Sequence, residues 1–164
     1  MNSDRRLAVI CGQIDCRTAL QQVSGETAGI AVVLERSVLY PYLWFTARCS
    51  VPTIGGRKAI SIDCLVDGIN GHATTTDTFL TDTVKLLDET QLPSGITRTT
   101  ARRAAQATVT HRLGRKLKLI APFDVRLREC GTVYRRFWIL RVGDGRVMID
   151  SVTGGMHPLA ARAA

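Results

Sequence analysis

Two stretches of the chain, Tyr40-Pro41-Tyr42-Leu43-Trp44 and Tyr134-Arg135-Arg136-Phe137-Trp138, share the pattern Tyr-x-x-x-Trp and hold both of its tryptophans. Each is followed by an apolar strand pattern and then by a turn pattern, Asp67-Gly68-Ile69-Asn70-Gly71 in the first and Asp150-Ser151-Val152-Thr153-Gly154 in the second. Self-similarity of this kind is the sequence signature of a duplicated supersecondary unit. We therefore interpret the chain as an internal duplication.

The composition is that of a globular protein. The chain has 164 residues, of which 45% are hydrophobic and 22% charged, which suits one domain or two small fused halves. No apolar run approaches the roughly 18 residues that a membrane span needs. The apolar run at residues 7–11 is too short for the core of a signal peptide. We therefore expect a cytoplasmic protein without a membrane span.

The cysteines do not form a metal-binding or disulfide pattern. Their number is odd, and no two of them are separated by two residues as in zinc knuckles. They stand at Cys11, Cys16, Cys49, Cys64 and Cys130. We expect reduced thiols, and neither a metal nor a cofactor.

The first half of the chain predicts helix followed by strands. Apolar spacing favours helix over residues 7–24 with a break at Gly12; alternatively, Asp15 caps a separate short helix over 16–24, which Gly25 ends. Strands are predicted at 30–34, 39–51 and 59–66, with a hairpin turn at 52–56. The last of these strands places four residues on one face: Ile60, Ile62, Cys64 and Val66.

The middle of the chain predicts a short element, a helix and then a linker. Residues 72–76 suit an edge strand or a loop. Asp77 can cap a helix that carries Leu80, Val84 and Leu87 at helical spacing. Residues 91–95, with Pro93, form the best linker. We therefore divide the chain into halves at 1–92 and 93–164.

The second half repeats the order of helix and strands. Thr99 or Thr100 is expected to cap a helix that runs to about residue 114. Small residues on one stripe of that helix allow close packing against a sheet: Ala101, Ala105, Val109 and Leu113. Strands follow at 123–130, 132–142 and 146–152, with turns at 130–131 and 143–145. The predicted fold class is α+β: two helix-plus-antiparallel-sheet halves, either separate or sharing one sheet.

Residues 98–156 resemble the PepSY domain family. The resemblance rests on the alanine-rich helix 101–113, the strand at 133–140, and Val147-Met148-Ile149-Asp150-Ser151-Val152-Thr153-Gly154, which looks like the family's strand-and-turn ending. A degenerate first copy lies at residues 16–76. The resemblance implies a helix packed on an antiparallel sheet. It also implies an interaction or protease-regulating module without catalytic residues of its own, and such modules are mostly extracytoplasmic.

Charge supplies the strongest functional signal. The net charge is +8, and residues 90–123 contain no Asp or Glu. A basic surface of this kind favours an acidic partner. The predicted basic face consists of Arg98, Arg102, Arg103, Arg112, Arg115, Lys116, Lys118 and Arg135. No recognition helix, RNA-binding motif or zinc finger accompanies it, so sequence-specific reading of nucleic acid is not supported.

Two further sets of residues allow two interpretations each. Tyr40, Trp44, Tyr134 and Trp138 either form an aromatic surface for a ligand or belong to the core beneath a helix. Asp67 and Asp150 either act as paired acid–base groups or accept backbone N–H groups within their turns. For both sets we favour the structural interpretation.

No catalytic motif is present. The chain lacks a P-loop, a dinucleotide glycine fingerprint, a nucleophile elbow and a His-Glu-x-x-His sequence, so we predict no catalytic residues. A dyad of Cys64 or Cys130 with His72 or His157 is the enzymatic alternative.

The predicted function is a non-enzymatic binding or assembly module for an acidic protein partner. The alternatives are a small accessory enzyme with a site between the halves and low-specificity nucleic-acid binding. Pairing of open sheet edges would also allow a homo-oligomer.

Overall fold

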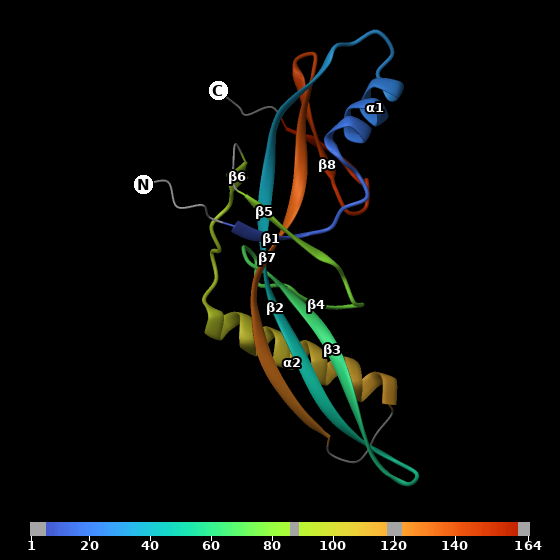
Figure 1. Ribbon diagram of the computed structural model, residues 1–164, viewed down its shortest axis with the longest axis vertical. Helices are drawn as coiled ribbons and strands as arrows, with labels where there is room; N and C mark the ends of the chain where they lie inside the picture. Colours follow the sequence, from blue (N-terminus) through green and yellow to red (C-terminus); the bar gives the residue numbers. More distant parts are fainter. Residues whose placement is uncertain (1–5, 86–88, 118–122, 161–164) are drawn as a thin grey trace. The chain divides into compact units, whose positions relative to one another are not determined.

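The computed structural model describes residues 6–85, 89–117 and 123–160. The elements are β1 (Arg6–Ile10), α1 (Cys16–Glu26), β2 (Val32–Thr53), β3 (Gly56–Asp67), β4 (Ala73–Thr76), β5 (Thr81–Lys85), β6 (Thr90–Gln91), α2 (Arg98–Leu117), β7 (Asp124–Val142), β8 (Gly145–Asp150) and β9 (Met156–Leu159) (Figure 1). The described strands join in one mixed sheet of nine strands, largely antiparallel. The α+β class is therefore confirmed. In the described part of the chain, neither helix is long and apolar enough to cross a membrane.

The chain forms two compact units, and each is built from separated segments. Unit 1 contains residues up to 40, residues 80–92 and residues from 134 onward, whereas unit 2 contains residues 41–79 and 93–133. This differs from the expected division at 1–92 and 93–164. The reason is that α1 packs with the strands of the second half and α2 with those of the first. The long strands β2 and β7 each contribute to both units.

The described residues of unit 1 form two apolar clusters. In the first, Ala19 and Val23 of α1 pack against Leu140 of β7 and Ile149 of β8. In the second, four buried residues gather: Leu7, Val9, Leu39 and Tyr134. Asp15 begins α1, since its carboxylate accepts a hydrogen bond from the Thr18 N–H at 2.7 Å. The alternative of a separate capped helix is thus confirmed, although α1 continues past Gly25 to Glu26.

Two stretches of unit 1 that were predicted as helix are strands instead. Residues 6–10 form β1, which pairs antiparallel with β5 from Arg6↔Lys85 to Ile10↔Thr81. The predicted helix after Asp77 is therefore also wrong over residues 81–85, and Leu87 lies outside the described residues. Each segment supplies the other's backbone hydrogen bonds, which overrides the apolar spacing of both.

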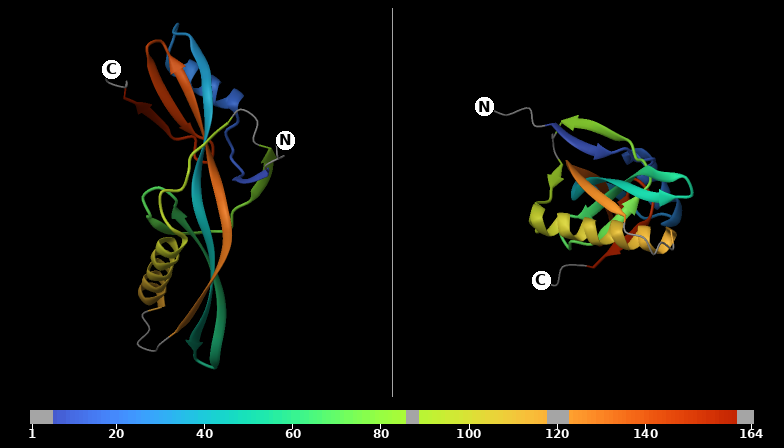
Figure 2. Two further views of the ribbon diagram at one scale, coloured as in Figure 1. Left: turned by 90° about the vertical axis from the view of Figure 1, so that its left-hand side faces the viewer. Right: turned by 90° about the horizontal axis from the view of Figure 1, so that it is seen from below.

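Unit 2 is a sheet with α2 packed on one of its faces (Figures 1 and 2). The stripe Ala101, Ala105, Val109 and Leu113 is at most 1% exposed, as the sequence predicts. The sheet supplies Leu43, Phe45, Ala47, Cys49 and Val51 from β2 and Cys64 and Val66 from β3, with Ile60 and Ile62 packed against them. The predicted common face of β3 is confirmed, and the hairpin closes at Thr53↔Gly56.

Strand β7 is continuous where two strands were predicted. The chain does not reverse at residues 130–131; Gly131 instead adopts a φ of 122°, which lets the strand continue through an irregular position. The predicted turn at 143–145 is present, with Val142 paired to Gly145. Residues 73–76 form the edge strand β4, which pairs only with β3 among the described strands.

The two Asp-x-x-x-Gly turns have the same hydrogen bonds. The carbonyl of Asp67 accepts the Gly71 N–H at 3.0 Å, and the carbonyl of Asp150 accepts the Gly154 N–H at 2.8 Å. Each carboxylate also accepts the N–H two residues later, at 2.8 and 2.9 Å. Both glycines have positive φ, 78° and 71°. The turn interpretation of the two aspartates is confirmed.

The Tyr-x-x-x-Trp patterns do not coincide when these turns are matched. Asp67 pairs with Tyr42, two residues before Trp44, whereas Asp150 pairs with Phe137, one residue before Trp138. A shift of one residue moves a side chain to the opposite face of a strand. Trp138 accordingly packs against the cluster under α1, while Trp44 stands between the α2-facing residues Leu43 and Phe45.

Candidate functional site

Helix α2 presents a basic surface that its own sequence does not neutralise. Thr97 caps the helix by accepting the Thr100 N–H at 3.1 Å, so the helix begins slightly earlier than predicted and continues to Leu117. Arg115 and Lys116 lie in the last turn, where the helix dipole favours positive charge. Arg98 lies in the first turn, where the dipole disfavours it, and forms an ion pair with Glu129 of β7.

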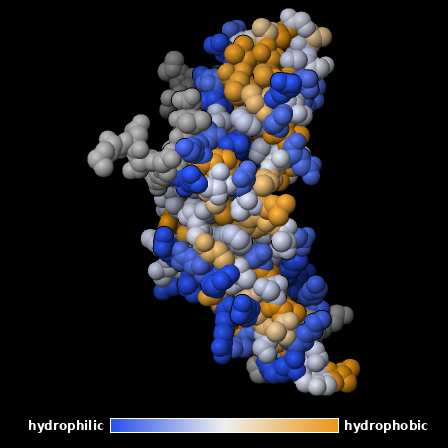
Figure 3. Space-filling model, in the orientation of Figure 1, coloured by the Kyte–Doolittle hydropathy of each residue, from blue (hydrophilic) through white to orange (hydrophobic). Residues whose placement is uncertain are grey.

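The structure exposes six of the predicted basic residues on α2. They are Arg98, Arg102, Arg103, Arg112, Arg115 and Lys116. Figure 3 shows the sheet side of unit 2, with α2 behind it, where hydrophilic and hydrophobic residues are mixed. Lys118 lies outside the described residues.

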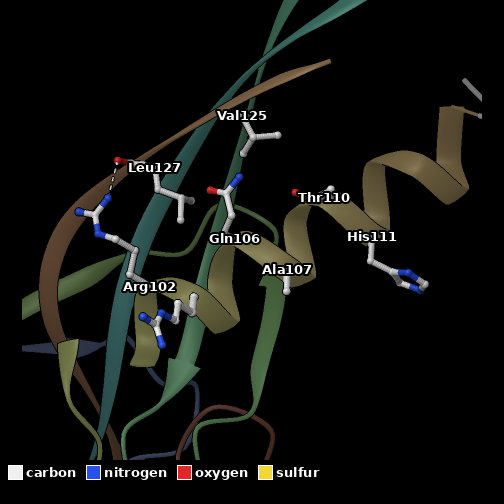
Figure 4. Close-up of a pocket in the computed structure, with 8 residues that line it drawn as sticks. Arg102, Gln106, Ala107, Thr110, His111, Val125 and Leu127 are labelled. Atoms are coloured by element: carbon white, nitrogen blue, oxygen red, sulfur yellow. Dashed lines mark hydrogen bonds between the residues drawn. The ribbon is translucent and has the colours of Figure 1, made fainter. Parts of the chain in front are cut away.

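A groove runs between α2 and β7 within unit 2. Its volume is about 770 Å³, and it is lined by Arg102, Arg103, Gln106, Ala107, Thr110 and His111 of the helix and by Val125 and Leu127 of the strand. Figure 4 shows Arg102 reaching Leu127 and Gln106 pointing toward Val125, whereas His111 points away from the strand. Among the described residues, the lining thus combines a partly apolar floor with two arginines and no carboxylate.

Arg102 connects the helix to the strand. Its Nη1 donates a hydrogen bond of 3.3 Å to the carbonyl oxygen of Leu127, and its guanidinium carbon lies 5.9 Å from the centre of the Phe45 ring. The side chain is nevertheless exposed. The guanidinium therefore keeps donors available at the mouth of the groove.

A second groove, of about 560 Å³, lies beside the C-terminal half of α2. Arg112 and Lys116 line it together with Lys58 of β3, and Asp63 and Asp77 line it as well. Arg112 also donates to the hydroxyl of Thr75. Two carboxylates offset three cations in this second groove. The described lining of the groove with Arg102 has two arginines and no such offset, so its net positive charge is larger.

Arg135 does not belong to the basic face. It lies in unit 1, where its guanidinium binds the carboxylate of Asp150 through Nε at 2.9 Å and through Nη2. Burial acts to raise the pKa of Asp150, but hydrogen bonds from Arg135, Thr153 and the Val152 N–H outweigh it, so that the pKa lies below its usual value. This pair stabilises the second turn.

The four predicted aromatic residues are divided between the two units, and each has its own contacts. Tyr134 is buried in the second cluster of unit 1, and the Trp138 indole N–H donates to the Ile14 carbonyl at 2.9 Å. The ring of Tyr40 packs on that of Phe137, with 6.1 Å between their centres. In unit 2, Trp44 contacts Phe79 and donates to Asp63.

The thiols and histidines are not arranged as a nucleophilic site. Cys64 is fully buried, and this burial raises its pKa to about 11, which disfavours the reactive thiolate. Cys130 contacts the Thr46 hydroxyl at 3.3 Å. His72 and His157 are exposed and belong to different units. Within residues 6–85, 89–117 and 123–160, no three His, Cys, Asp or Glu side chains gather where they could hold a metal ion.

The strand side of the groove is not among the predicted site residues. Val125 and Leu127 alternate with the exposed Asp124, Arg126 and Arg128, a pattern that marks one half-buried face of a strand. The alternation predicts a half-buried strand face from the sequence, but it does not indicate that α2 leaves this face partly uncovered.

Comparisons with family models, curated proteins and solved structures give no match for this chain. The PepSY-like resemblance stays a prediction.

Proposed function

We propose that this chain is a non-enzymatic binding module whose groove between α2 and β7 takes an acidic protein partner. One observation carries the proposal: Arg102 and Arg103 line an open groove whose described lining contains no carboxylate and has apolar side chains in its floor. Carboxylates of a partner would pair with the two guanidinium groups, and its apolar residues would cover Ala107, Val125 and Leu127.

Nucleic acid is the competing partner for a basic surface. Phosphates would pair with arginines equally well, but the described residues of the groove lining include no Phe, Tyr or Trp ring on which a base could stack. The apolar part of the lining gains more from a protein side chain than from a phosphate backbone. These features favour the protein partner.

The test compares two acidic polymers on two matched variants. Arg102→Gln combined with Arg103→Gln removes two charges from the groove, while Arg17→Gln combined with Arg36→Gln removes two exposed charges from unit 1. We expect the first variant to bind polyglutamate about tenfold more weakly at low salt and the second to bind like the native protein. Equal loss in both variants, or tight binding of duplex DNA without binding of polyglutamate, would refute the proposal.

We also propose that the two halves arose by duplication. The same order of helix, long strand, shorter strand, turn and short strand occurs twice, as α1-β2-β3-β4 and α2-β7-β8-β9. The matching hydrogen bonds of the two turns support common origin. Matched at the turns, Trp138 corresponds to Leu43 rather than to Trp44.

A further inference from the structure

The strand side of the groove is an open sheet edge. Strand β7 has β2 on one side, and on its other side β1 pairs with it at Tyr134 and β8 pairs from Phe137 onward. No described strand pairs with residues 124–129 on the side away from β2. These six residues span about 20 Å, enough for an extended peptide to pair along them.

The side chains beside this edge alternate in kind. Val125 and Leu127 are half-buried and pack against the α2 cluster, whereas Arg126 and Arg128 are exposed. Successive side chains of an added strand would face the two sides of the sheet in turn. One set would enter the groove beside Arg102 and Arg103, and the other would lie beside Arg126 and Arg128.

One main-chain carbonyl of this edge already accepts a hydrogen bond from a side chain of α2. The Leu127 carbonyl accepts the hydrogen bond from Arg102 Nη1, whose length of 3.3 Å is slightly beyond the usual range for such bonds. A peptide N–H can replace that donor at the carbonyl. Once its bond to the Leu127 carbonyl is replaced, the exposed guanidinium of Arg102 can bind a carboxylate of the peptide.

Charge decides which strand can be added. In a second copy paired about Leu127, Arg126 would lie opposite Arg128, and like charges on neighbouring strands are unfavourable. Within one copy, Asp124 pairs with Arg126 at 3.1 Å and leaves Arg128 without this partner. Helix α2 contains no acidic residue in its first turn and none elsewhere along its length. An acidic strand avoids the repulsion between arginines, because Asp124 and Glu129 of the edge already have Arg126 and Arg98 as partners. Nucleic acid has no peptide groups with which to pair.

We propose that residues 124–129 of β7 accept an extended acidic segment of a partner protein as an added strand, with carboxylates alternating with apolar side chains. This inference rests on the proposed function, because it names the manner in which the same groove takes its acidic partner. Main-chain hydrogen bonds hold the segment, and arginines on both faces select its charge.

The experiment uses a synthetic peptide of about eight residues in which Glu and Val alternate. Two further peptides carry N-methyl groups on alternate backbone nitrogens, one in each of the two frames. Only one edge of an added strand faces β7, so methylation in one frame removes the pairing N–H groups and methylation in the other leaves them. We expect one frame to weaken binding by about tenfold or more and the other to bind like the parent peptide.

Hydrogen exchange locates the peptide. With the parent peptide bound, amides within residues 124–129 should exchange more slowly, while those of the edge strand β5 should not change. Equal binding of both methylated frames, or no added protection at 124–129, would overturn the added strand. If polyglutamate still bound in an Arg102- and Arg103-dependent manner, the proposed function would stand. Failure of the parent peptide together with polyglutamate would overturn both.

Discussion

Asp150 is a buried carboxylate with several donors around it. Its side chain accepts hydrogen bonds from Arg135, Thr153 and the backbone of Val152. Asp150→Asn would leave the Arg135 guanidinium without its counter-charge, so we expect the free energy of unfolding to fall by about 3 kcal/mol. Asp67→Asn, at the equivalent but less buried turn position, should cost about 1 kcal/mol. Urea denaturation of the two variants measures both; equal losses would contradict this account.

The lowered pKa of Asp150 also sets a pH dependence. A carboxylate whose pKa is lower in the folded protein contributes its full stability above its unfolded value, about 3.9, and loses it as the pH falls through the folded value. We therefore expect the free energy of unfolding of the native protein to fall more steeply below about pH 4 than that of Asp150→Asn. Parallel acid titrations by circular dichroism would show the difference, and superimposable curves would argue against it.

The cysteines should react in the order of their exposure. Cys11 is exposed, whereas Cys49 and Cys64 are buried and their pKa values are raised by that burial, that of Cys64 to about 11. Alkylation at neutral pH followed by mass spectrometry should label Cys11 first and the two buried thiols only on unfolding. Rapid labelling of Cys64 in the folded protein would revive the thiol–histidine alternative.

At the scale of elements, the cap of α2 offers a direct test. Thr97→Ala removes the side chain that accepts the Thr100 N–H, and we expect a loss of about 1 kcal/mol in the free energy of unfolding. Thr99→Ala, which alters an exposed threonine of the first turn, serves as the control and should be near neutral. Thermal denaturation compares the two. Similar losses would place the cap elsewhere than at Thr97.

Elements with a strong local signal were predictable, and elements that depend on a distant partner were not. The stripe from Ala101 to Leu113 and the hairpin turn near Gly55 follow from local periodicity and turn chemistry. The helix predictions at β1 and β5 were wrong because each strand is defined by pairing with the other, which lies most of the first half away in sequence. Gly131 was misread because positive φ serves a strand irregularity as well as a turn.

The candidate site was predictable in part. Arginines on a helix without acids could be read as a basic face, and six of them are exposed on α2. Arg135 was misassigned to that face because its partner Asp150 follows fifteen residues later on a paired strand. The groove itself depends on how α2 crosses β7, which periodicity does not specify.

For the whole molecule, the composition of the two units predicts how fragments behave. Unit 1 combines α1 with β8, and unit 2 combines α2 with β3, so a cut after residue 92 separates each helix from its sheet. We expect fragments 1–92 and 93–164 to lack cooperative unfolding alone and to regain it when mixed. A nick at the hairpin tip beside the fully exposed Ile54 is the control and should leave both units intact. Independent folding of fragment 93–164 would contradict the packing of each helix on strands of the other half.

The packing of α1 on β7 and β8 also affects the order of events during synthesis. The Trp138 indole that binds the Ile14 carbonyl lies 124 residues after it, so the ribosome releases α1 long before its partner strands exist. Contacts so distant in sequence carry a large loop-closure cost and slow folding. Until β8 emerges, Ala19 and Val23 have no core to join, and the nascent chain presents their apolar face to chaperones and to neighbouring chains.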